Sequence, residues 1–310
     1  MPTVETLTSE IARKVQDTSY TNDIILGLLQ QLHLELAEGV IVPGERRKTP
    51  PLPELFKIAN IYTSPSLPYV TLPTDYMRDL VFCANSAKQE VKRTDTFIEF
   101  ATYYPNMNEI RIIERIAVKG RQLYYQGIER TTIVSNDPTS PVLQIPEVTF
   151  TASTKTITDT SGDFRFLGLE VGQLINVDGT VSNDGDKTIV TVATNGASCT
   201  VAETVVNETT FAALSVITIY AGVRLTIHYY RTPETMTADN DTPEGIPSSL
   251  QYPLFVYGIT SRIYDEIEDG VEGQKVNALF NEKKFNEAVF MLVKSIPDEG
   301  PSFFIGPDRR

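Results

Sequence analysis

The chain has 310 residues, 41% of them hydrophobic and 22% charged, which is the composition of a globular protein with room for two domains. Its formal net charge of −13 argues against a tight, nonspecific grip on DNA or RNA, because Lys and Arg supply most of such binding. No apolar run approaches the roughly 18 residues that a membrane-spanning helix requires, and the N-terminus does not resemble a secretory signal. We therefore expect a protein made in the cytoplasm that binds no membrane.

The N-terminal third is predicted to begin with two helices, over residues 4–16 and 24–38. In the second helix one apolar stripe recurs at helical spacing: Ile25, Leu28, Leu29, Leu32 and Leu36. Gly39 is a plausible stop, and a proline-rich loop follows that carries Arg46, Arg47 and Lys48. This basic cluster is either a solvated loop or a contact with a phosphate backbone or an acidic partner.

Short segments rich in β-branched and aromatic residues follow, within residues 69–83, 96–104 and 121–134. They predict strands of a small antiparallel sheet that packs against helices.

From Val148 to about Tyr220 the composition shifts to Thr and Val, and apolar and polar residues alternate. Asp178-Gly179, Asp184-Gly185 and Asn195-Gly196 are pairs that favour tight reversals. The alternation resumes over residues 223–229, so we expect the 148–220 segment to be an all-β insert within a sheet.

The C-terminal region is predicted to hold two helices. Ser248 and Gln251 match a capping box, although Pro253 makes the start of the first helix uncertain, and its apolar stripe is Val256, Ile259, Ile263 and Ile267. The second helix, residues 274–295, is predicted to carry on one side Val276, Leu279, Phe280, Val289, Phe290 and Val293. The tail beyond Pro297 holds an apolar triplet, Phe303, Phe304 and Ile305, for which docking on a partner, packing on its own chain and disorder remain open.

Residues that carry chemistry are scarce. The only histidines, His33 and His228, leave zinc sites and histidine-based triads little material, and both are expected to be structural or surface residues. Residues 183–187 and 238–244 lack the spacing of a calcium loop. Cys83 and Cys199 are expected to be buried thiols rather than a disulfide. We therefore expect no catalysis, no metal and no cofactor.

Taken in order, several short motifs resemble the head-to-tail adaptor (connector) proteins of tailed bacteriophages. The resemblance extends over about 230 residues outside the insert. It rests on the order of two long N- and C-terminal helical regions and on these residues: Leu72, Pro73, Thr74, Asp75, Tyr76, Tyr229, Tyr230, Arg231, Thr232, Pro233, Asp241, Thr242, Pro243, Ile246 and Pro247. The insert departs from the family pattern, so its role does not follow from the resemblance.

The resemblance implies an α+β fold: a helical adaptor core with a small antiparallel sheet, plus an inserted all-β domain, either an Ig-like sandwich or a small barrel. The core would comprise residues 1–147 and 221–296, the insert 148–220 and a docking tail 297–310. The helices beginning at Ser248 would turn Ile259, Ile263 and Ile267 to the subunit's own core.

The function implied by the resemblance is structural. The chain would form a ring of twelve copies in the neck of the virion, bind the portal protein above and the tail or nozzle proteins below, and let DNA pass an acidic channel without specific binding. Portal docking is expected from Phe303, Phe304, Ile305, Arg309 and Arg310, and the insert would contact the capsid or a tail fibre or spike.

Two alternatives remain. A virion or tail protein whose insert recognises a receptor or capsid surface would need exposed aromatics among Phe150, Phe164, Phe166, Phe211 and Tyr220, and the chain has no Trp. A hydrolase of the tail machinery is disfavoured by the lack of a nucleophile motif.

Overall fold

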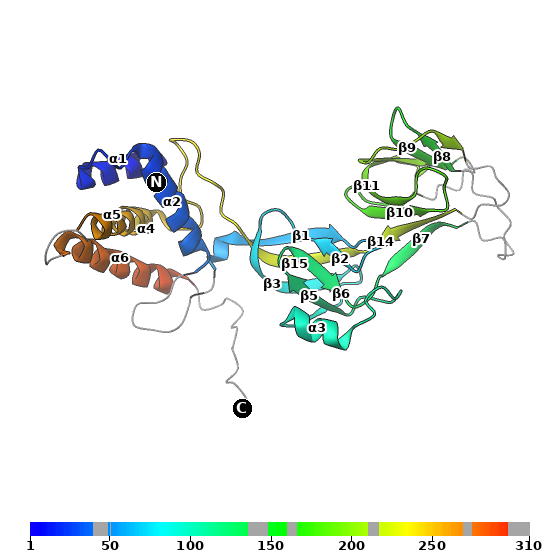
Figure 1. Cartoon of the computed structure of the whole chain (residues 1–310), viewed down its shortest axis with the longest axis horizontal. Helices are drawn as coiled ribbons and strands as arrows, with labels where there is room; N and C mark the ends of the chain where they lie inside the picture. Colours follow the sequence, from blue (N-terminus) through cyan, green and yellow to red (C-terminus); the bar gives the residue numbers. More distant parts are fainter. Residues whose placement is uncertain are drawn as a thin grey trace. The chain divides into compact units, whose positions relative to one another are not determined.

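The structure is a computed structural model that describes residues 1–39, 49, 51–135, 148–159, 166–209, 217–268 and 275–296. The chain divides into two compact units (Figure 1). The helical unit comprises Met1–Lys57, Asp75–Asp79 and Tyr230–Arg310, and the β unit comprises Ile58–Thr74 and Leu80–Tyr229. The boundaries of these two units differ from those of the predicted core and 148–220 insert, and the predicted division stays a prediction.

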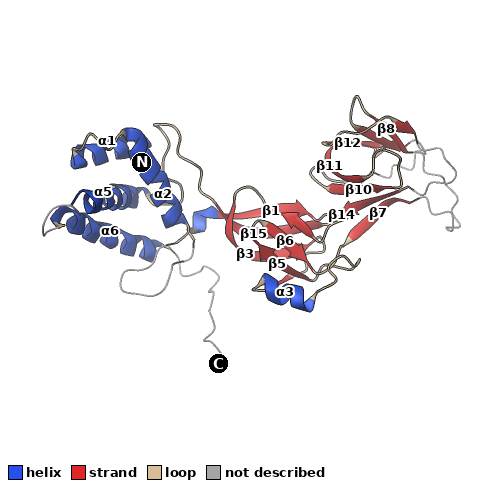
Figure 2. Ribbon diagram, in the orientation of Figure 1, coloured by secondary structure: helices blue, strands red, loops and turns tan. Residues whose placement is uncertain are grey.

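The helical unit brings helices from the N-terminal and C-terminal regions of the sequence together (Figure 2). Its elements are α1 (Val4–Val15), α2 (Asn22–Ala37), the short 3-10 turn η1 (Pro53–Leu55), α4 (Ser248–Tyr252), the π-helical turn η2 (Pro253–Tyr257), α5 (Gly258–Glu268) and α6 (Val276–Ser295). α5 contacts α1, α2 and α6, and η2 contacts the same three helices. The α5–η2 segment is therefore the centre of the unit.

The core of the helical unit confirms most of the predicted stripes. Leu7 and Ile11 of α1 are buried together with Ile25, Leu29, Leu32 and Leu36 of α2, and with Val256, Ile259 and Ile263 of the C-terminal helices. Burying each such side chain contributes roughly 1.5–3 kcal/mol. Ile267, predicted to face the core, is 37% exposed, because it lies in the last turn of α5.

The start of α4 differs from the predicted capping box. Pro247 is the N-cap residue and no side chain caps the helix. Pro253 lacks the N–H that an α-helix needs at that position, and the chain passes through the π-helical turn η2 before α5 resumes the α-helix. Gln251 has another role, described with the site below.

The β unit and its borders hold three sheets. Their strand orders are β1-β15-β3, β2-β6-β5-β4 and β13-β8-β9-β12-β11-β10-β14-β7. The strands are β1 (Phe56–Tyr62), β2 (Tyr69–Thr71), β3 (Tyr76–Asn85), β4 (Lys92–Arg93), β5 (Arg115–Lys119), β6 (Gln122–Tyr125), β7 (Arg130–Ser135), β8 (Val148–Thr151), β9 (Thr156–Asp159), β10 (Leu174–Asp178), β11 (Gly185–Val192), β12 (Ser198–Val201), β13 (Glu208–Thr209), β14 (Thr218–Gly222) and β15 (Arg224–Arg231).

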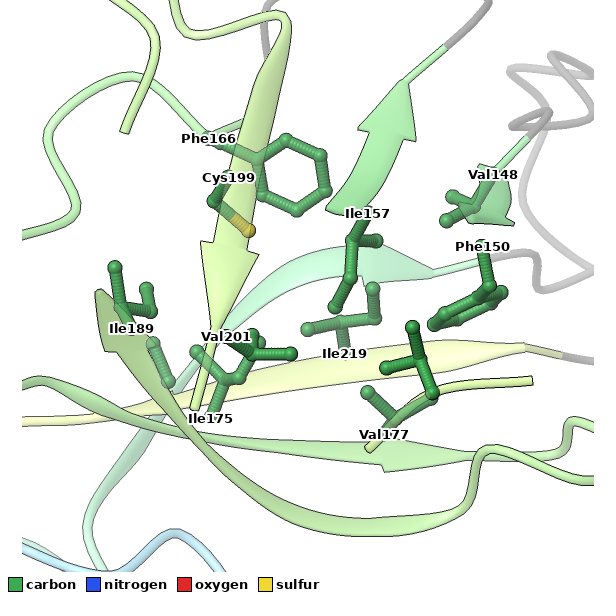
Figure 3. Packing of buried hydrophobic residues seen from close by; sticks show 12 residues of the cluster. Val148, Phe150, Ile157, Phe166, Ile175, Val177, Ile189, Cys199, Val201 and Ile219 are labelled. Carbon is green, nitrogen blue, oxygen red and sulfur yellow. The ribbon is translucent and has the colours of Figure 1, made fainter. Parts of the chain in front are cut away.

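The largest sheet continues past the predicted limits of the insert. The chain enters it on β7 and leaves it on β14, and these strands pair antiparallel from Thr218↔Ser135 to Gly222↔Arg130. Inside it, alternating residues form one core whose side chains point toward one another (Figure 3). These residues are Val148, Phe150, Ile157, Phe166, Ile175, Val177, Ile189, Cys199, Val201, Val205, Ile219 and Ala221.

The three predicted Asp-Gly and Asn-Gly pairs lie at two reversals, one between β10 and β11 and one between β11 and β12. Gly179, Gly185 and Gly196 all have positive φ, a backbone conformation that glycine adopts without steric cost. At Gly196 the space is also tight, because an added Cβ would meet the backbone of Leu167 at 2.6 Å. Only glycine fits this turn.

The predicted fold class is wrong. The described residues form three sheets with 15 strands, and 31% of these residues are helical, so the fold is not a helical core with one small sheet. The periodicity of the long helices is visible locally, whereas the short strands pair with partners far away in sequence, as β1 and β3 do with β15.

One segment predicted as a strand is a helix. Residues 97–103 form α3 (Phe97–Tyr103), and Thr96 caps it by accepting a hydrogen bond from the backbone N–H of Glu99 at 3.2 Å. Thr96 and Glu99 have the spacing of a capping box. The aromatic content of the segment outweighed this signal in the sequence-based prediction.

Candidate functional site: the linker and the last helix

Two of the motifs that carry the resemblance meet in the helical unit. The backbone N–H of Thr232 donates to the carbonyl oxygen of Asp75 at 2.7 Å, and the carboxylate of Asp75 pairs with Lys57 Nζ at 2.6 Å. Tyr230 is buried next to them, with its ring edge-on to Phe56 at a centroid distance of 5.8 Å. The end of β15 is thereby fixed to the start of β3.

The other motif residues around this point are structural as well. Leu72 is buried, and its N–H donates to the carbonyl of Arg121 at 2.8 Å. Arg121 in turn donates to the carbonyl of Pro73 at 2.8 Å. Tyr76 begins β3, and Tyr229 is fully buried near the end of β15.

The segment that follows, residues 232–247 (the linker), is held from both ends of the sequence. Gln30 of α2 donates to the carbonyl of Met236 at 2.7 Å, and His33 Nε2 is 2.9 Å from the carbonyl of Glu244. Gln251 of α4 donates to the carbonyls of Pro243 and Ile246, both at 2.9 Å. The linker is therefore bound to α2 and α4 through its backbone.

Asp241 shapes the turn that covers the start of α1. Its Oδ2 accepts the backbone N–H groups of Thr237 at 2.7 Å and Ala238 at 2.8 Å, and these bonds lower the pKa of the Asp241 carboxyl. The carbonyls of Asp241 and Asp239 accept the N–H groups of Val4 at 2.9 Å and Glu5 at 3.1 Å. Two donors at the N-terminus of α1 are thus satisfied by the linker.

Glu244 and Arg231 form the charged part of this arrangement. Arg231 binds both carboxylate oxygens of Glu244, one of them at 3.0 Å, and the N–H of Glu234 donates to the same carboxylate at 3.1 Å. Burial alone would raise the pKa of Glu244, but the hydrogen bonds from Arg231 and Glu234 outweigh it and lower the pKa. A paired carboxylate of this kind stays ionised.

His33 is a buried structural histidine, as predicted. It is 2% exposed, its ring lies edge-on to Phe255 at 5.9 Å, and burial lowers its pKa. The neutral ring donates from Nε2 to the Glu244 carbonyl. His228 of β15 lies against the ring of Phe82 with a centroid distance of 5.0 Å.

α6 presents apolar side chains on two opposite faces. Ala278, Ala288, Val289 and Leu292 are buried against α4, α5 and η2. The other face (the outer face of α6) has side chains that are 49% to 61% exposed: Val276, Leu279, Phe280, Phe290 and Met291. The prediction that Val289 shares a side with Phe280 and Phe290 is wrong, because the two sets lie on opposite faces.

The outer face is hollowed into an open groove of about 540 Å³. Leu279 and Phe290 line its two ends, and Glu282, Lys283, Asn286 and Glu287 line its middle. Lys284 makes an ion pair with Glu287 at 3.0 Å. A partner for this groove needs apolar groups at both ends and charges between them.

Two groups of predicted contact residues lie outside the described residues. They are the basic loop with Arg46, Arg47 and Lys48, and the tail with Phe303, Phe304, Ile305, Arg309 and Arg310. Their proposed contacts stay predictions.

The described residues provide no cluster of metal ligands and no membrane-spanning helix. Within the described ranges no group of three or more His, Cys, Asp or Glu could hold a metal ion. Asn183, considered for a calcium loop, is buried and uses its side chain to bind Val206 and Glu208. None of the described helices combines the length and apolarity needed to cross a membrane.

Sequence reasoning missed Arg231, Glu244 and Gln251 as linker contacts. Among the residues that contact the linker, only His33 stands out in the sequence, because it is a polar residue inside an apolar stripe.

A scan of the sequence against protein-family models finds no match, and no curated protein is significantly similar to it.

Proposed function

We propose that the chain is a structural adaptor in the neck of a tailed bacteriophage, where copies assemble as a ring under the portal, extend the DNA channel and recruit the tail. The observation that carries the proposal is the contact between Asp75 and Thr232. Residues 72–76 and 229–233 resemble two motifs of the adaptor family, and one residue of each, Asp75 and Thr232, are 157 positions apart in sequence but hydrogen-bonded in the helical unit.

The linker contacts support a mechanism based on rigidity. Gln251 fixes the start of α4 to the linker, and Gln30 and His33 fix the linker to α2. A subunit of a closed ring has to hold its contact surfaces at constant angles, because a heterologous contact closes only at one rotation. The motif residues would therefore serve the adaptor by setting the angle of the C-terminal helices.

The copy number, the neighbouring proteins and the properties of the DNA channel are proposed from the resemblance and from the net charge. Twelve copies would form the ring, with the portal protein above and tail or nozzle proteins below. Each copy adds a formal charge of −13, which would keep DNA from adhering as it passes. Phe303, Phe304 and Ile305 would anchor the ring to the portal, and the 148–220 segment would contact the capsid, a fibre or a spike.

Sedimentation with the portal ring encoded by the same genome tests the proposal. The full chain should co-sediment with the portal ring, and a variant ending at residue 296 should fold but remain at the top of the gradient. A full-length variant with Phe303, Phe304 and Ile305 all replaced by Ser separates the role of the apolar triplet from that of tail length. Failure of the full chain to co-sediment would contradict the adaptor function.

A surface-binding role is the second candidate, and one observation favours it. Val181 is 92% exposed between β10 and β11, and Leu167 and Val171 are also exposed in the same sheet's loops. The described aromatics give less support, since Phe150 and Phe166 are buried and the Tyr220 ring lies 3.6 Å below the Arg130 guanidinium. Val181→Asp should weaken binding to host cells only under this alternative, since the adaptor proposal places the 148–220 segment against other virion proteins.

A further inference from the structure

The outer face of α6 needs a partner for a physical reason. Its apolar residues fall within roughly a third of the helix circumference at 100° per residue, and the buried residues of α6 lie on the opposite side. In Figure 1, α6 lies at the edge of the helical unit, and among the described elements its main contacts are with α4, α5 and η2. A helix that is apolar on both faces is ordinarily covered on both.

The order of residues along this face is self-complementary. When two α6 helices are laid antiparallel and centred at the level of Phe285, Phe280 faces Phe290 of the other copy and Leu279 faces Met291. In the same register Lys283 faces Glu287, and by symmetry each contact occurs twice. Within the part of the chain that the structure describes, Lys283 has no ion-pair partner, so its charge is open to such a contact.

Other arrangements match less well. In a parallel pair in register, Lys283 faces Lys283 and Glu287 faces Glu287, so like charges meet in the middle of the groove. The antiparallel arrangement also sets the two helix dipoles in opposite directions, which is the favourable orientation. The groove has Leu279 and Phe290 at its ends and charged side chains between them. An antiparallel second copy therefore places apolar side chains against apolar ones and charges against opposite charges.

We propose that the outer face of α6 binds the outer face of α6 of a second copy of this chain, antiparallel and about a two-fold axis. Such a contact is isologous, so it joins two copies and stops, whereas a ring needs a head-to-tail contact. The pair therefore goes beyond the adaptor function and does not depend on it. It covers the apolar face in the free protein, before any ring is formed.

Sedimentation velocity of the purified full chain over a range of concentrations tests the pairing. The unmodified chain should form dimers. Lys283→Glu places two pairs of carboxylates face to face and should raise the dissociation constant at least about tenfold, and Glu287→Lys should do the same through two Lys–Lys contacts. The double variant K283E/E287K restores opposite charges and should recover dimerisation.

Lys92→Glu is the matched control, because it makes the same charge change on the exposed strand β4 and should leave the dimer intact. Far-UV circular dichroism of each variant reports whether the helices are formed. An unmodified chain that stays monomeric, or a double variant that fails to recover the dimer, would overturn the pairing. A K283E variant that dimerises as tightly as the unmodified chain would also overturn it, and ring-sized species in that variant would leave the adaptor proposal standing, because a ring needs a head-to-tail contact.

Discussion

Gly258 of α5 lies directly against Phe285 of α6. A Cβ added to Gly258 would stand 2.8 Å from Cδ2 of Phe285 and 2.9 Å from Cδ2 of Leu32 in α2. The glycine thus lets three helices approach one another at one point, which is the centre of the helical unit.

Gly258→Ala should therefore destabilise the protein by about 1–3 kcal/mol, because both neighbouring side chains have to move to admit a methyl group. Gly27→Ala is the matched control. Gly27 also lies in a helix, but beyond its own helix backbone no atom of the described residues lies within 4 Å of its added Cβ, so the change should be neutral or stabilising by up to about 1 kcal/mol. Urea unfolding of both variants measures the difference, and equal effects would contradict the close packing.

The second prediction concerns Gln251. Replacing it by Leu leaves the carbonyls of Pro243 and Ile246 without their donor and should cost about 2–4 kcal/mol of unfolding free energy. Gln31→Leu, at an exposed position of α2, should change stability by no more than about 0.5 kcal/mol. If the two variants unfold at the same denaturant concentration, Gln251 does not hold the linker.

The third prediction is a pH dependence that comes from His33. Burial lowers the pKa of His33 below its usual value of 6.5, so the folded chain binds its proton less readily than the unfolded chain. The stability that the neutral, buried His33 contributes is fully present above about pH 6.5. As the pH falls below that value, the free energy of unfolding decreases by up to about 1.4 kcal/mol per pH unit.

Unfolding free energies measured between pH 7.5 and pH 5.5 check this window, which lies above the range where carboxylates titrate. His33→Gln retains a donor for the Glu244 carbonyl but cannot titrate, so its stability should vary less with pH than that of the parent. A pH profile of H33Q identical to the parent's would show that His33 is not the group responsible.

The fourth prediction concerns the two thiols. Burial raises the pKa of Cys83 and of Cys199 to about 12, so neither forms the reactive thiolate at neutral pH. A thiol reagent should leave the folded protein unmodified over hours and should modify two cysteines per chain in urea. Fast labelling of one thiol without denaturant would contradict its burial.

Parts of the fold were predictable because they depend on local signals. The stripe from Ile25 to Leu36 and the glycine turns at Gly179, Gly185 and Gly196 require only near neighbours in sequence. The fold class was not predictable in this way, because sheets such as β1-β15-β3 join segments more than 100 residues apart. α3 was missed because aromatic side chains, typical of strands, fill a helix that Thr96 caps.

The linker site was only half predictable. Asp75, Tyr230 and Asp241 were singled out by resemblance, but the groups that they contact are brought near only by the fold and cannot be read from the sequence. Gln251 and Arg231 act on carbonyls and a carboxylate brought close by the fold. The outer face of α6 was predicted as one apolar side, because a sequence stripe does not tell which of two faces meets the core.

The adaptor function is tested most directly by electron microscopy of the purified protein, alone and mixed with the portal ring encoded by the same genome. The expected result is a ring of this chain that caps the portal in the mixture. A protein that never forms a ring and leaves the portal uncovered would contradict it.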